Sequence, residues 1–438
     1  MWRAPPRPDG HPWRGAPTLA GVTIAPLPTE LGVRTRPVDD PGRLIDLLPD
    51  DRNPLCWVRG GDGLVGWGEV ARFTGEGPGR FADADAWWRE FSTRLDVRDE
   101  VGAPGTGPVA FASFTFAAGS VGSTLVVPRV LVGRRDGRSW VTEFSAGDGS
   151  PVSAVRPVRR TGSLRYSDGD LPVAGYRRAV AEAVRRMRAG ELAKAALAHD
   201  LLAVGDAPLD PRFLLGGLAG RYPTCWSFAV DRLVGATPEM LVSRVGGRTV
   251  RSRVLAGTLW PGADGRDADR SELAARLLGS AKDRHEHALA VDSLADALRP
   301  LCTALDVPDT PDVISLRNVS HLSTDVEGTL DPTAPASLLQ LADAVHPTAA
   351  VGGTPRAAAV DLIAELEGMD RGRYAGPVGW VDGAGDGELG IALRCAQLDG
   401  PVARLFAGCG VVSDSDPDTE VREAAAKMAA VRDALEAG

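Results

Sequence analysis

Short alternating apolar and polar segments, separated by glycine-rich turns, dominate residues 19–150. A period of two predicts β-strands, and the turn residues between the segments predict hairpins. A formal G-x-G-x-x-G motif begins at Gly61, but glycines and a proline follow it where a dinucleotide-binding motif would open a helix. This motif therefore predicts a hairpin. Residues 1–18 are rich in proline and polar side chains, which predicts a flexible tail.

The rest of the chain alternates strand patterns with longer amphipathic segments. Residues 173–191 and 417–437 carry apolar positions at helical spacing, and residues 267–302 predict one long helix. Strand patterns lie between these segments and are joined by hairpins, for example at Gly246-Gly247. Strands paired through hairpins, with helices inserted among them, predict an α+β fold with large, mainly antiparallel sheets.

Length and composition narrow the class of protein. A chain of 438 residues predicts roughly two or three domains. The net charge of −9 is spread along the chain, without the basic face that a nucleic-acid-binding protein would carry. Five scattered cysteines without a C-x-x-C pair indicate neither a disulfide framework nor a zinc knuckle. No apolar run is long enough for a membrane span, and the N-terminus lacks the apolar core of a secretory signal. We expect a cytoplasmic protein with a small-molecule substrate.

Lys194 is the first candidate for a catalytic residue. It lies in the segment MRAGELAKAALAHD, where it is surrounded by small apolar residues of the kind that pack in a protein core. On a strand, Lys194 shares a face with Ala196, Ala198 and Asp200. The two alanines are small and leave room beside the amine. Apolar surroundings disfavour the charged form of a lysine, and a neutral amine can act as a general base. The alternative is a solvent-exposed lysine on an edge strand, which protects against aggregation.

Four acidic residues are further candidates. Glu239 follows a proline at the bend between two strand patterns, so it is either a general acid with a raised pKa or a surface carboxylate. Glu286 falls on the apolar stripe of its helix, and no H-E-x-x-H zinc motif surrounds it. Glu420, Glu423 and Lys427 share one helix face. Glu423 and Lys427 form at least an ordinary ion pair, and with Glu286 the carboxylates predict an oxygen site suited to Mg²⁺.

Together, the motifs resemble those of the chorismate-utilising enzymes, which comprise anthranilate, aminodeoxychorismate, salicylate and isochorismate synthases. The resemblance is strong over residues 172–436 and weaker before them. It implies a two-subdomain sandwich of large antiparallel sheets flanked by helices, in which residues 19–150 and 172–438 form one composite domain. The motifs are AGELAK with Lys194, GATPE with Glu239, AGT at 256–258, SAKDRHEH with Glu286, SHLSTDVEG with His321, VHPTAAVGGTP with His346, YAGPVGW with Tyr374, IALRC with Arg394, and GCGVVSDSDPDTEVREAAAK at 408–427.

The resemblance also implies roles. Family members that add water to chorismate carry a lysine at the position of Lys194, whereas those that add ammonia typically carry glutamine. Lys194 would deprotonate the water that attacks C2, Glu239 would protonate the departing C4 hydroxyl, and the product would be isochorismate. Mg²⁺ would lie on Glu286 and Glu423, with Glu420 nearby. The implied substrate-binding residues are Gly257, Thr258, His321, His346, Tyr374, Arg394, Gly408, Cys409, Gly410 and Lys427.

Three departures from the family pattern keep alternatives open. His199 stands where arginine is common, GTLWPG at 257–262 lacks two usual arginines, and Ala349 replaces a proline. A salicylate synthase, which also releases pyruvate, would use the same lysine. A catalytically inactive binding protein on this scaffold is the alternative of another class. We expect a monomer, and the motifs leave open whether the product serves menaquinone or siderophore synthesis.

Overall fold

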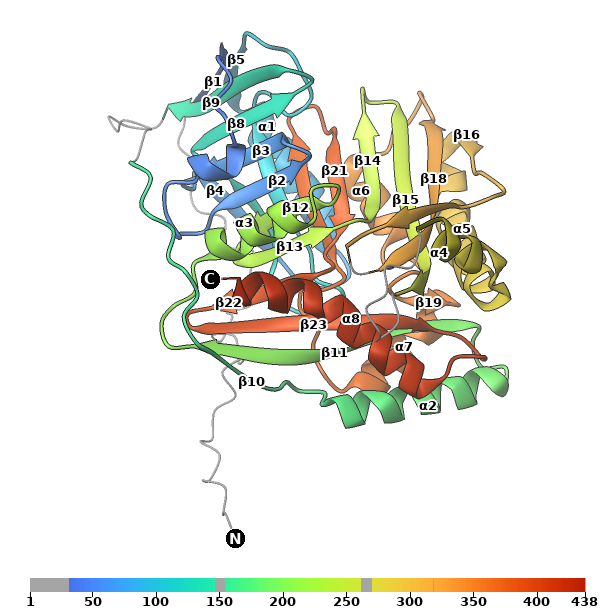
Figure 1. The fold of residues 1–438 in the computed structure, drawn as a ribbon. Coiled ribbons are helices and arrows are strands. Elements are labelled where there is room, and N and C mark those ends of the chain that lie inside the picture. The colour runs from blue at the N-terminus through green and yellow to red at the C-terminus, as the bar shows by residue number, and fades with distance from the viewer. Residues whose placement is uncertain (1–30, 146–153, 261–269, 318, 438) are drawn as a thin grey trace.

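Two large sheets form the framework of the chain in a computed structural model that describes residues 31–145, 154–260, 270–317 and 319–437 (Figure 1). The first sheet has the spatial order β10 (Leu164–Asp168), β11 (Lys194–Gly205), β23 (Val402–Val411), β22 (Cys395–Asp399), β13 (Leu233–Thr237), β12 (Trp226–Val230), β2 (Leu55–Arg59), β3 (Asp62–Trp67), β8 (Val130–Arg135), β9 (Arg138–Ser145), β1 (Leu31–Val38) and β5 (Leu95–Asp99), with β19 (Gly353–Thr354) beside β11. The second sheet has the order β16 (Cys302–Asp306), β18 (Ser320–Leu330), β15 (Thr249–Leu259), β14 (Met240–Val245), β21 (Gly387–Ile391), β20 (Pro377–Asp382), β6 (Val109–Ser113), β7 (Ser123–Val127) and β4 (Ala71–Gly75), with β17 (Asp312–Ser315) beside β18.

Helices flank both sheets. Among the described residues, the pairing within the sheets is antiparallel except between β1 and β5, which confirms the predicted α+β class. Helices α2, α7 and α8 pack against β11 or β23, and α5 packs against β15 and β18. The helices are α1 (Arg80–Thr93), α2 (Val173–Arg188), α3 (Pro211–Arg221), α4 (Arg270–Gly279), α5 (Ala281–Leu298), α6 (Leu338–Val345), α7 (Arg356–Glu367) and α8 (Pro417–Glu436), with short 3₁₀ turns at Leu44–Leu47 and Arg299–Leu301.

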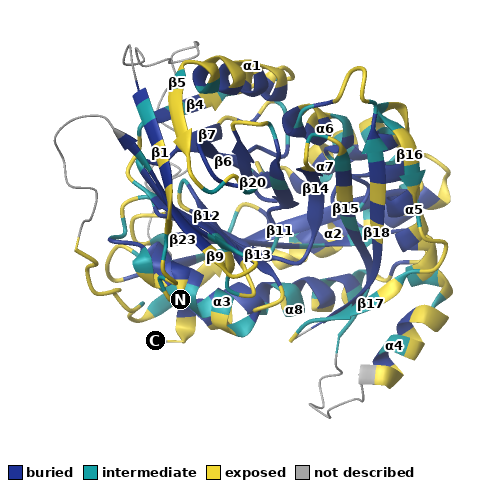
Figure 2. Cartoon of the chain, turned by 90° about the horizontal axis from the view of Figure 1, so that it is seen from above, coloured by how far each residue is buried: buried dark blue, intermediate teal, exposed yellow. Residues whose placement is uncertain are grey.

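The N-terminal third supplies strands to both sheets. In the first sheet, Trp57 of β2 pairs with Phe228 of β12, and in the second, Phe111 of β6 pairs with Trp380 of β20. These four aromatic side chains are buried, and Figure 2 shows that the buried strands run through the middle of the molecule. Each sheet is therefore continuous across the two parts of the chain, and one hydrophobic core spans both.

Two predicted hairpins are present. The glycines that mimic a dinucleotide motif form the β2–β3 hairpin, and Gly60 and Gly61 take φ values of 59° and 95° at its tip. Gly246 and Gly247 turn β14 into β15 with φ values of 61° and 65°. Glycine suits these turns because it adopts positive φ without a steric penalty.

The single long helix predicted over residues 267–302 is wrong, because the chain breaks it into α4 and α5. Gly279 ends α4, and the Ser280 side chain caps α5 by accepting a hydrogen bond from the Asp283 N–H at 3.2 Å. Glycine is a poor helix former and serine a preferred N-cap, so the Gly-Ser pair favours a restart over continuation. Residues 267–269 and the predicted tail at 1–18 lie outside the described residues.

Of the helices in the described ranges, none combines enough length and apolarity to cross a membrane.

Candidate active site

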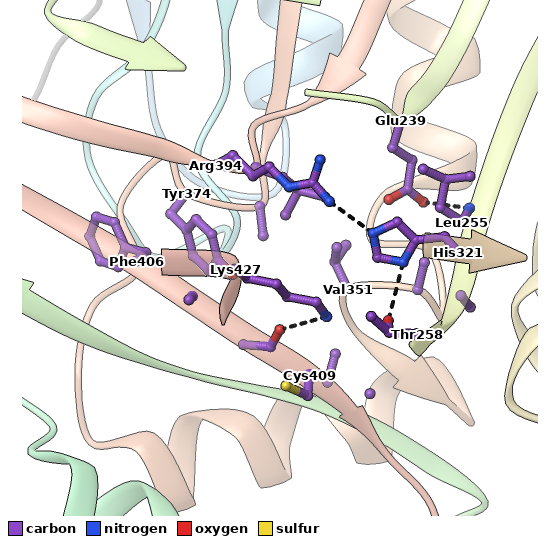
Figure 3. A pocket seen from close by; sticks show the side chains of 18 of the residues that line it. Glu239, Leu255, Thr258, His321, Val351, Tyr374, Arg394, Phe406, Cys409 and Lys427 are labelled. Atoms are coloured by element: carbon purple, nitrogen blue, oxygen red, sulfur yellow. Dashed lines mark hydrogen bonds between the residues drawn. The ribbon is translucent and has the colours of Figure 1, made fainter. Parts of the chain in front are cut away.

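A cavity of about 80 Å³ lies where the two sheets meet (Figure 3). Strands β11 and β23 of the first sheet and β15 and β18 of the second contribute lining residues, and α5 and α8 each contribute one. Most of the lining is apolar or small. The charged side chains that line it are Glu239, Glu286, Arg371, Arg394 and Lys427.

Lys194 is completely buried at the start of β11. It pairs with Thr354 of β19, and the adjacent Ala195 pairs with Val411 of β23, so the exposed edge-strand alternative is wrong. The Lys194 Nζ lies 3.2 Å from the Glu286 Oε1 and donates a hydrogen bond to the Glu286 backbone carbonyl at 3.3 Å. Glu286 lines the cavity, whereas Lys194 is not among the lining residues.

All three lysines of the chain are at this site, although the chain has forty-six arginines. Each lysine forms an ion pair with a different glutamate of the predicted metal set. Lys282 was missed by the sequence reasoning, and the rarity of lysine was the signal that could have found it. The pairs are Lys194–Glu286 at 3.2 Å, Lys282–Glu420 at 2.9 Å and Lys427–Glu423 at 2.7 Å.

Two of these glutamates lie one turn apart on α8. Oxygens of Glu420 and Glu423 lie within 4.8 Å of each other, and both side chains are buried. Burial and the charge of Glu423 raise the pKa of Glu420 to about 7, and the Glu420 Oε2 is buried without a hydrogen-bond partner among the described residues. A cation would relieve both conditions, because it would accept the free oxygen as a ligand and offset the repulsion.

Glu286 approaches the same region from α5. Its burial alone would raise its pKa, but the charges of Lys194, Lys427 and Lys282 outweigh that effect and lower the pKa, which keeps the carboxylate ionised. Gly410 allows this approach, since a Cβ there would lie 2.1 Å from the Glu286 Oε1. Carboxylate oxygens suit Mg²⁺, so Glu420 and Glu423 fit the predicted ion, whereas Glu286 is not in the group of ligand atoms within 4.8 Å that these two residues form.

Glu239 lies in the two-residue break between β13 and β14 and faces the cavity (Figure 3). Burial raises its pKa to about 7, although the Leu255 N–H, at 3.4 Å from the Glu239 Oε1, and the charges of Lys194, Lys427 and Arg394 act to lower it. A carboxyl group with this pKa carries a proton for much of the time near neutral pH, as a general acid requires.

Arg394, His321 and Thr258 form a chain along one wall (Figure 3). The Arg394 Nη2 donates to the His321 Nε2 at 2.8 Å, and because a guanidinium only donates, that nitrogen carries no proton. The neutral ring then donates from Nδ1 to the Thr258 Oγ1 at 3.1 Å. Burial, together with the charge of Arg394, lowers the pKa of His321 well below its usual range, in agreement with a neutral ring.

The Arg394 guanidinium lies near the Cys225 thiol, but one of its two arms makes no conventional hydrogen bond. Its Nη1 is buried and has no hydrogen-bond partner within the described ranges. A buried cationic donor without a partner is costly, and a carboxylate in the cavity would satisfy it. The carboxylate that the sequence reasoning expected for Arg394 is thus not supplied by the described protein residues.

Replacing Arg394 by alanine is expected to raise the KM for the carboxylate substrate about 10- to 100-fold, because one charge-assisted hydrogen bond is worth about 1.5–3 kcal/mol. Steady-state kinetics would measure this change, and kcat should change less than KM. Arg232→Ala, which removes an exposed ion pair with Asp399, is the matched control and should leave KM unaltered. An unchanged KM in Arg394→Ala would contradict the assignment.

Other predicted binding residues also line the cavity. The Tyr374 ring stacks on Phe406 with centroids 4.9 Å apart, and burial raises the pKa of Tyr374, which keeps its hydroxyl protonated. The Lys427 Nζ also donates to the Gly408 carbonyl at 3.1 Å. Residues 408–410 line the cavity through β23, so nearly all of the predicted binding set is brought together here.

Two predicted binding residues do not line the cavity. His346 is buried elsewhere, where its Nε2 donates to the Phe116 carbonyl at 2.9 Å, and burial lowers its pKa to about 3. We therefore correct its role from substrate binding to packing. Gly257 lies at a bulge of β15 with a φ of 72°, and it orients its neighbour Thr258, which does line the cavity. A Cβ at Gly257 would lie 3.0 Å from Asp283.

Comparisons with known proteins agree with this geometry. The model of the family described as chorismate binding enzyme matches residues 153–436. A Mycobacterium tuberculosis protein that carries the name of an isochorismate synthase, MenF, is 40% identical over 347 residues, which cover 76% of this chain and 87% of that protein. The salicylate biosynthesis isochorismate synthase of Pseudomonas aeruginosa is 34% identical over 422 residues, 89% of this chain and 86% of the relative.

A solved structure shares the architecture. The menaquinone-specific isochorismate synthase MenF from Escherichia coli superposes with a TM-score of 0.75, is 24% identical, and covers 94% of this chain and 96% of its own. That likeness establishes the fold of two antiparallel sheets. The family match covers well over half of the sequence and includes every strand and helix that supplies the cavity, so this chain belongs to the family of chorismate-binding enzymes.

Proposed function

We propose that this chain is a magnesium-dependent isochorismate synthase, which converts chorismate to isochorismate by adding water at C2 and expelling the C4 hydroxyl. The observation that carries the proposal is a buried amine, 3.2 Å from a glutamate that lines the cavity, together with a proton-bearing carboxyl group that lines the same cavity. Lys194, at the start of β11, supplies the amine, and Glu239, in the break between β13 and β14, supplies the carboxyl group. The names of the relatives from M. tuberculosis and P. aeruginosa support the same reaction.

In the proposed reaction, the amine of Lys194 is the base that takes a proton from a water molecule, whose oxygen then bonds to C2. Both ring double bonds shift, the C4–oxygen bond breaks, and Glu239 gives its proton to the departing hydroxyl, which leaves as water. One water enters and one leaves, so the net reaction is an isomerisation. Both protein groups are buried, which excludes bulk water from the step.

The remaining residues bind the charges of a dicarboxylate. The free Nη1 of Arg394 and the hydroxyl of Tyr374 can donate to one carboxylate. Glu286 and Glu423, with Glu420 beside them, would hold Mg²⁺, which when bound supplies positive charge for the other carboxylate and competes with Lys194 for Glu286. The predicted monomeric state and cytoplasmic location stay predictions.

Chromatography of products from purified protein, chorismate and Mg²⁺ tests the proposal. We expect isochorismate, with turnover lost on adding a chelator and restored by excess Mg²⁺. Fluorescent salicylate and pyruvate formed without a second enzyme would instead identify a salicylate synthase. No turnover with folded protein and Mg²⁺ would support the inactive binding protein.

The proposed role of Glu239 sets the pH dependence. Because the pKa of Glu239 is raised to about 7 and the acid must be protonated, its ionisation should make kcat fall by up to tenfold per unit above that pH. The charged groups Lys194, Lys427 and Arg394 oppose the raised pKa. A pH–rate profile at saturating chorismate and Mg²⁺ measures this limb, and a kcat that rises steadily above pH 7 would contradict the assignment.

A further inference from the structure

The thiol of Cys409 lies against the two carboxylates of α8. Its Sγ and oxygens of Glu420 and Glu423 all lie within 4.8 Å of one another, and all three side chains are buried. The Cys409 Sγ hydrogen-bonds to the Glu420 backbone carbonyl at 3.3 Å, which fixes the sulfur beside the start of the helix. Cys409 is also a lining residue of the cavity, and Figure 3 shows it below Lys427, so an ion that enters the cavity can reach this region.

A second observation shows that this group lacks a ligand. The Glu420 Oε2 is buried and has no hydrogen-bond partner among the described residues, whereas its Oε1 is held by Lys282 at 2.9 Å. The Glu423 Oε1 is likewise held by Lys427, at 2.7 Å. The lysines thus secure one oxygen of each carboxylate, and Glu420 keeps its other oxygen available inside the protein.

We propose that Cys409, Glu420 and Glu423 form a binding site for a thiophilic divalent metal ion, with Zn²⁺ as the best-suited ion, in addition to the proposed Mg²⁺ function of the carboxylates. Thiolate ligands select zinc over magnesium, and one sulfur with two oxygens leaves a fourth tetrahedral position for water. Zinc at this site would occupy the carboxylates that Mg²⁺ needs. The inference goes beyond the proposed function and holds whether or not the chain turns over chorismate.

The geometry requires only modest side-chain adjustment. Zinc bonds of about 2.0–2.3 Å hold tetrahedral donor atoms roughly 3.5 Å apart, and the present donors are within 4.8 Å. The two glutamates can close this gap by rotating about their side-chain torsions. A zinc-bound cysteine binds as the thiolate, so binding of the ion would release the thiol proton.

Co²⁺ is the spectroscopic probe for the test, because a thiolate bound to Co²⁺ gives a charge-transfer band that carboxylates do not give. We would titrate the metal-free, full-length protein with Co²⁺ in the absence of chorismate and then displace it with Zn²⁺. The expected result is a thiolate–cobalt band that saturates at one ion per chain, that Zn²⁺ removes, and that Mg²⁺ alone never produces. The absence of this band in the wild-type protein would overturn the proposal.

Two variants locate the ligand. In Cys409→Ala the band should vanish, and the affinity for Zn²⁺ should fall at least about tenfold. Cys302→Ala is the matched control, because Cys302 is the more exposed thiol on β16 and should leave the band intact. A band that persists in Cys409→Ala, or one that is lost in Cys302→Ala, would overturn the site.

A further measurement shows whether Cys409→Ala loses the cobalt band because it lacks the sulfur or because it is unfolded. Circular dichroism and a thermal melt establish that Cys409→Ala is folded, and Cys409→Ser, which keeps the volume, replaces it if it is not. Glu420→Gln retains the sulfur but removes the charge of the free oxygen, so it should weaken Co²⁺ binding while keeping a thiolate band. Unchanged binding in folded Glu420→Gln would exclude that carboxylate and contradict the proposed donor set.

Discussion

Replacing Lys194 by alanine is expected to lower kcat about 10³-fold, with a smaller change in the KM for chorismate. General-base catalysis contributes about 10²–10⁴ to a rate, and a loss of 10³ corresponds to about 4 kcal/mol of transition-state stabilisation. The Lys194 amine is completely buried beside Glu286, so bulk water cannot readily take its place. Steady-state kinetics with chorismate and Mg²⁺ would measure the loss.

Lys194→Arg is the matched control, since it separates a base from a fixed positive charge. A guanidinium stays protonated in proteins, so the arginine variant retains the ion-pair charge and cannot accept a proton. We expect both variants to be inactive and small primary amines to restore part of the activity of Lys194→Ala. A substantially active Lys194→Arg would show that the charge alone matters and would refute the role as base.

Folding must be measured in the same variants, because removing the lysine leaves Glu286 with one partner fewer. Breaking a buried ion pair costs about 3–5 kcal/mol when the remaining charge is uncompensated, but Lys282 and Lys427 also act on Glu286. A thermal melt and the far-ultraviolet circular dichroism would show whether the loss of activity occurs in folded protein.

The fold class could be predicted from the sequence because the strand periodicity and turn residues are local signals. The hairpin at Gly246-Gly247 is an example, since both residues must take positive φ. The signal that separates α4 from α5 at Ser280 is also local, because serine is a preferred N-cap. It was overlooked because the apolar stripe of the two helices continues across the break. The pairing of β2 with β12 depends on side chains more than a hundred residues apart, and a single sequence carries no local signal for it.

The site residues were found by motif, but their partners were not. Lys194, Glu239 and Glu286 were named from spacing and resemblance, whereas the ion pair between Lys194 and Glu286 arises only when β11 and α5 meet. Lys282 was missed because an exposed helix lysine is the ordinary interpretation of such a position. His346 was misplaced because its motif lies close to the site in sequence, while its ring turns toward Phe116 and packs.

Replacing Glu239 by glutamine is expected to lower kcat about 10²- to 10³-fold. Glutamine has nearly the same shape and keeps an oxygen that can accept from the Leu255 N–H, but it has no proton to give at neutral pH. Because the charge of the ionised form is also removed, the substrate should bind at least as well as before. The kinetic signature is thus a loss in kcat with a KM that is unchanged or lower.

The pH profile of the same variant decides whether Glu239 is the acid. The fall of kcat above about pH 7 should disappear in Glu239→Gln, since the group that titrates there is gone. Asp382→Asn is the control: burial and the charge of Asp386 raise the pKa of Asp382 to about 6, yet Asp382 is not among the residues that line the cavity. Asp382→Asn should keep the wild-type kcat and should also keep the fall of kcat above about pH 7. If Glu239→Gln retained the fall of kcat above pH 7 while Asp382→Asn lost it, another group would supply the proton. The assignment of Glu239 as the general acid would then be wrong.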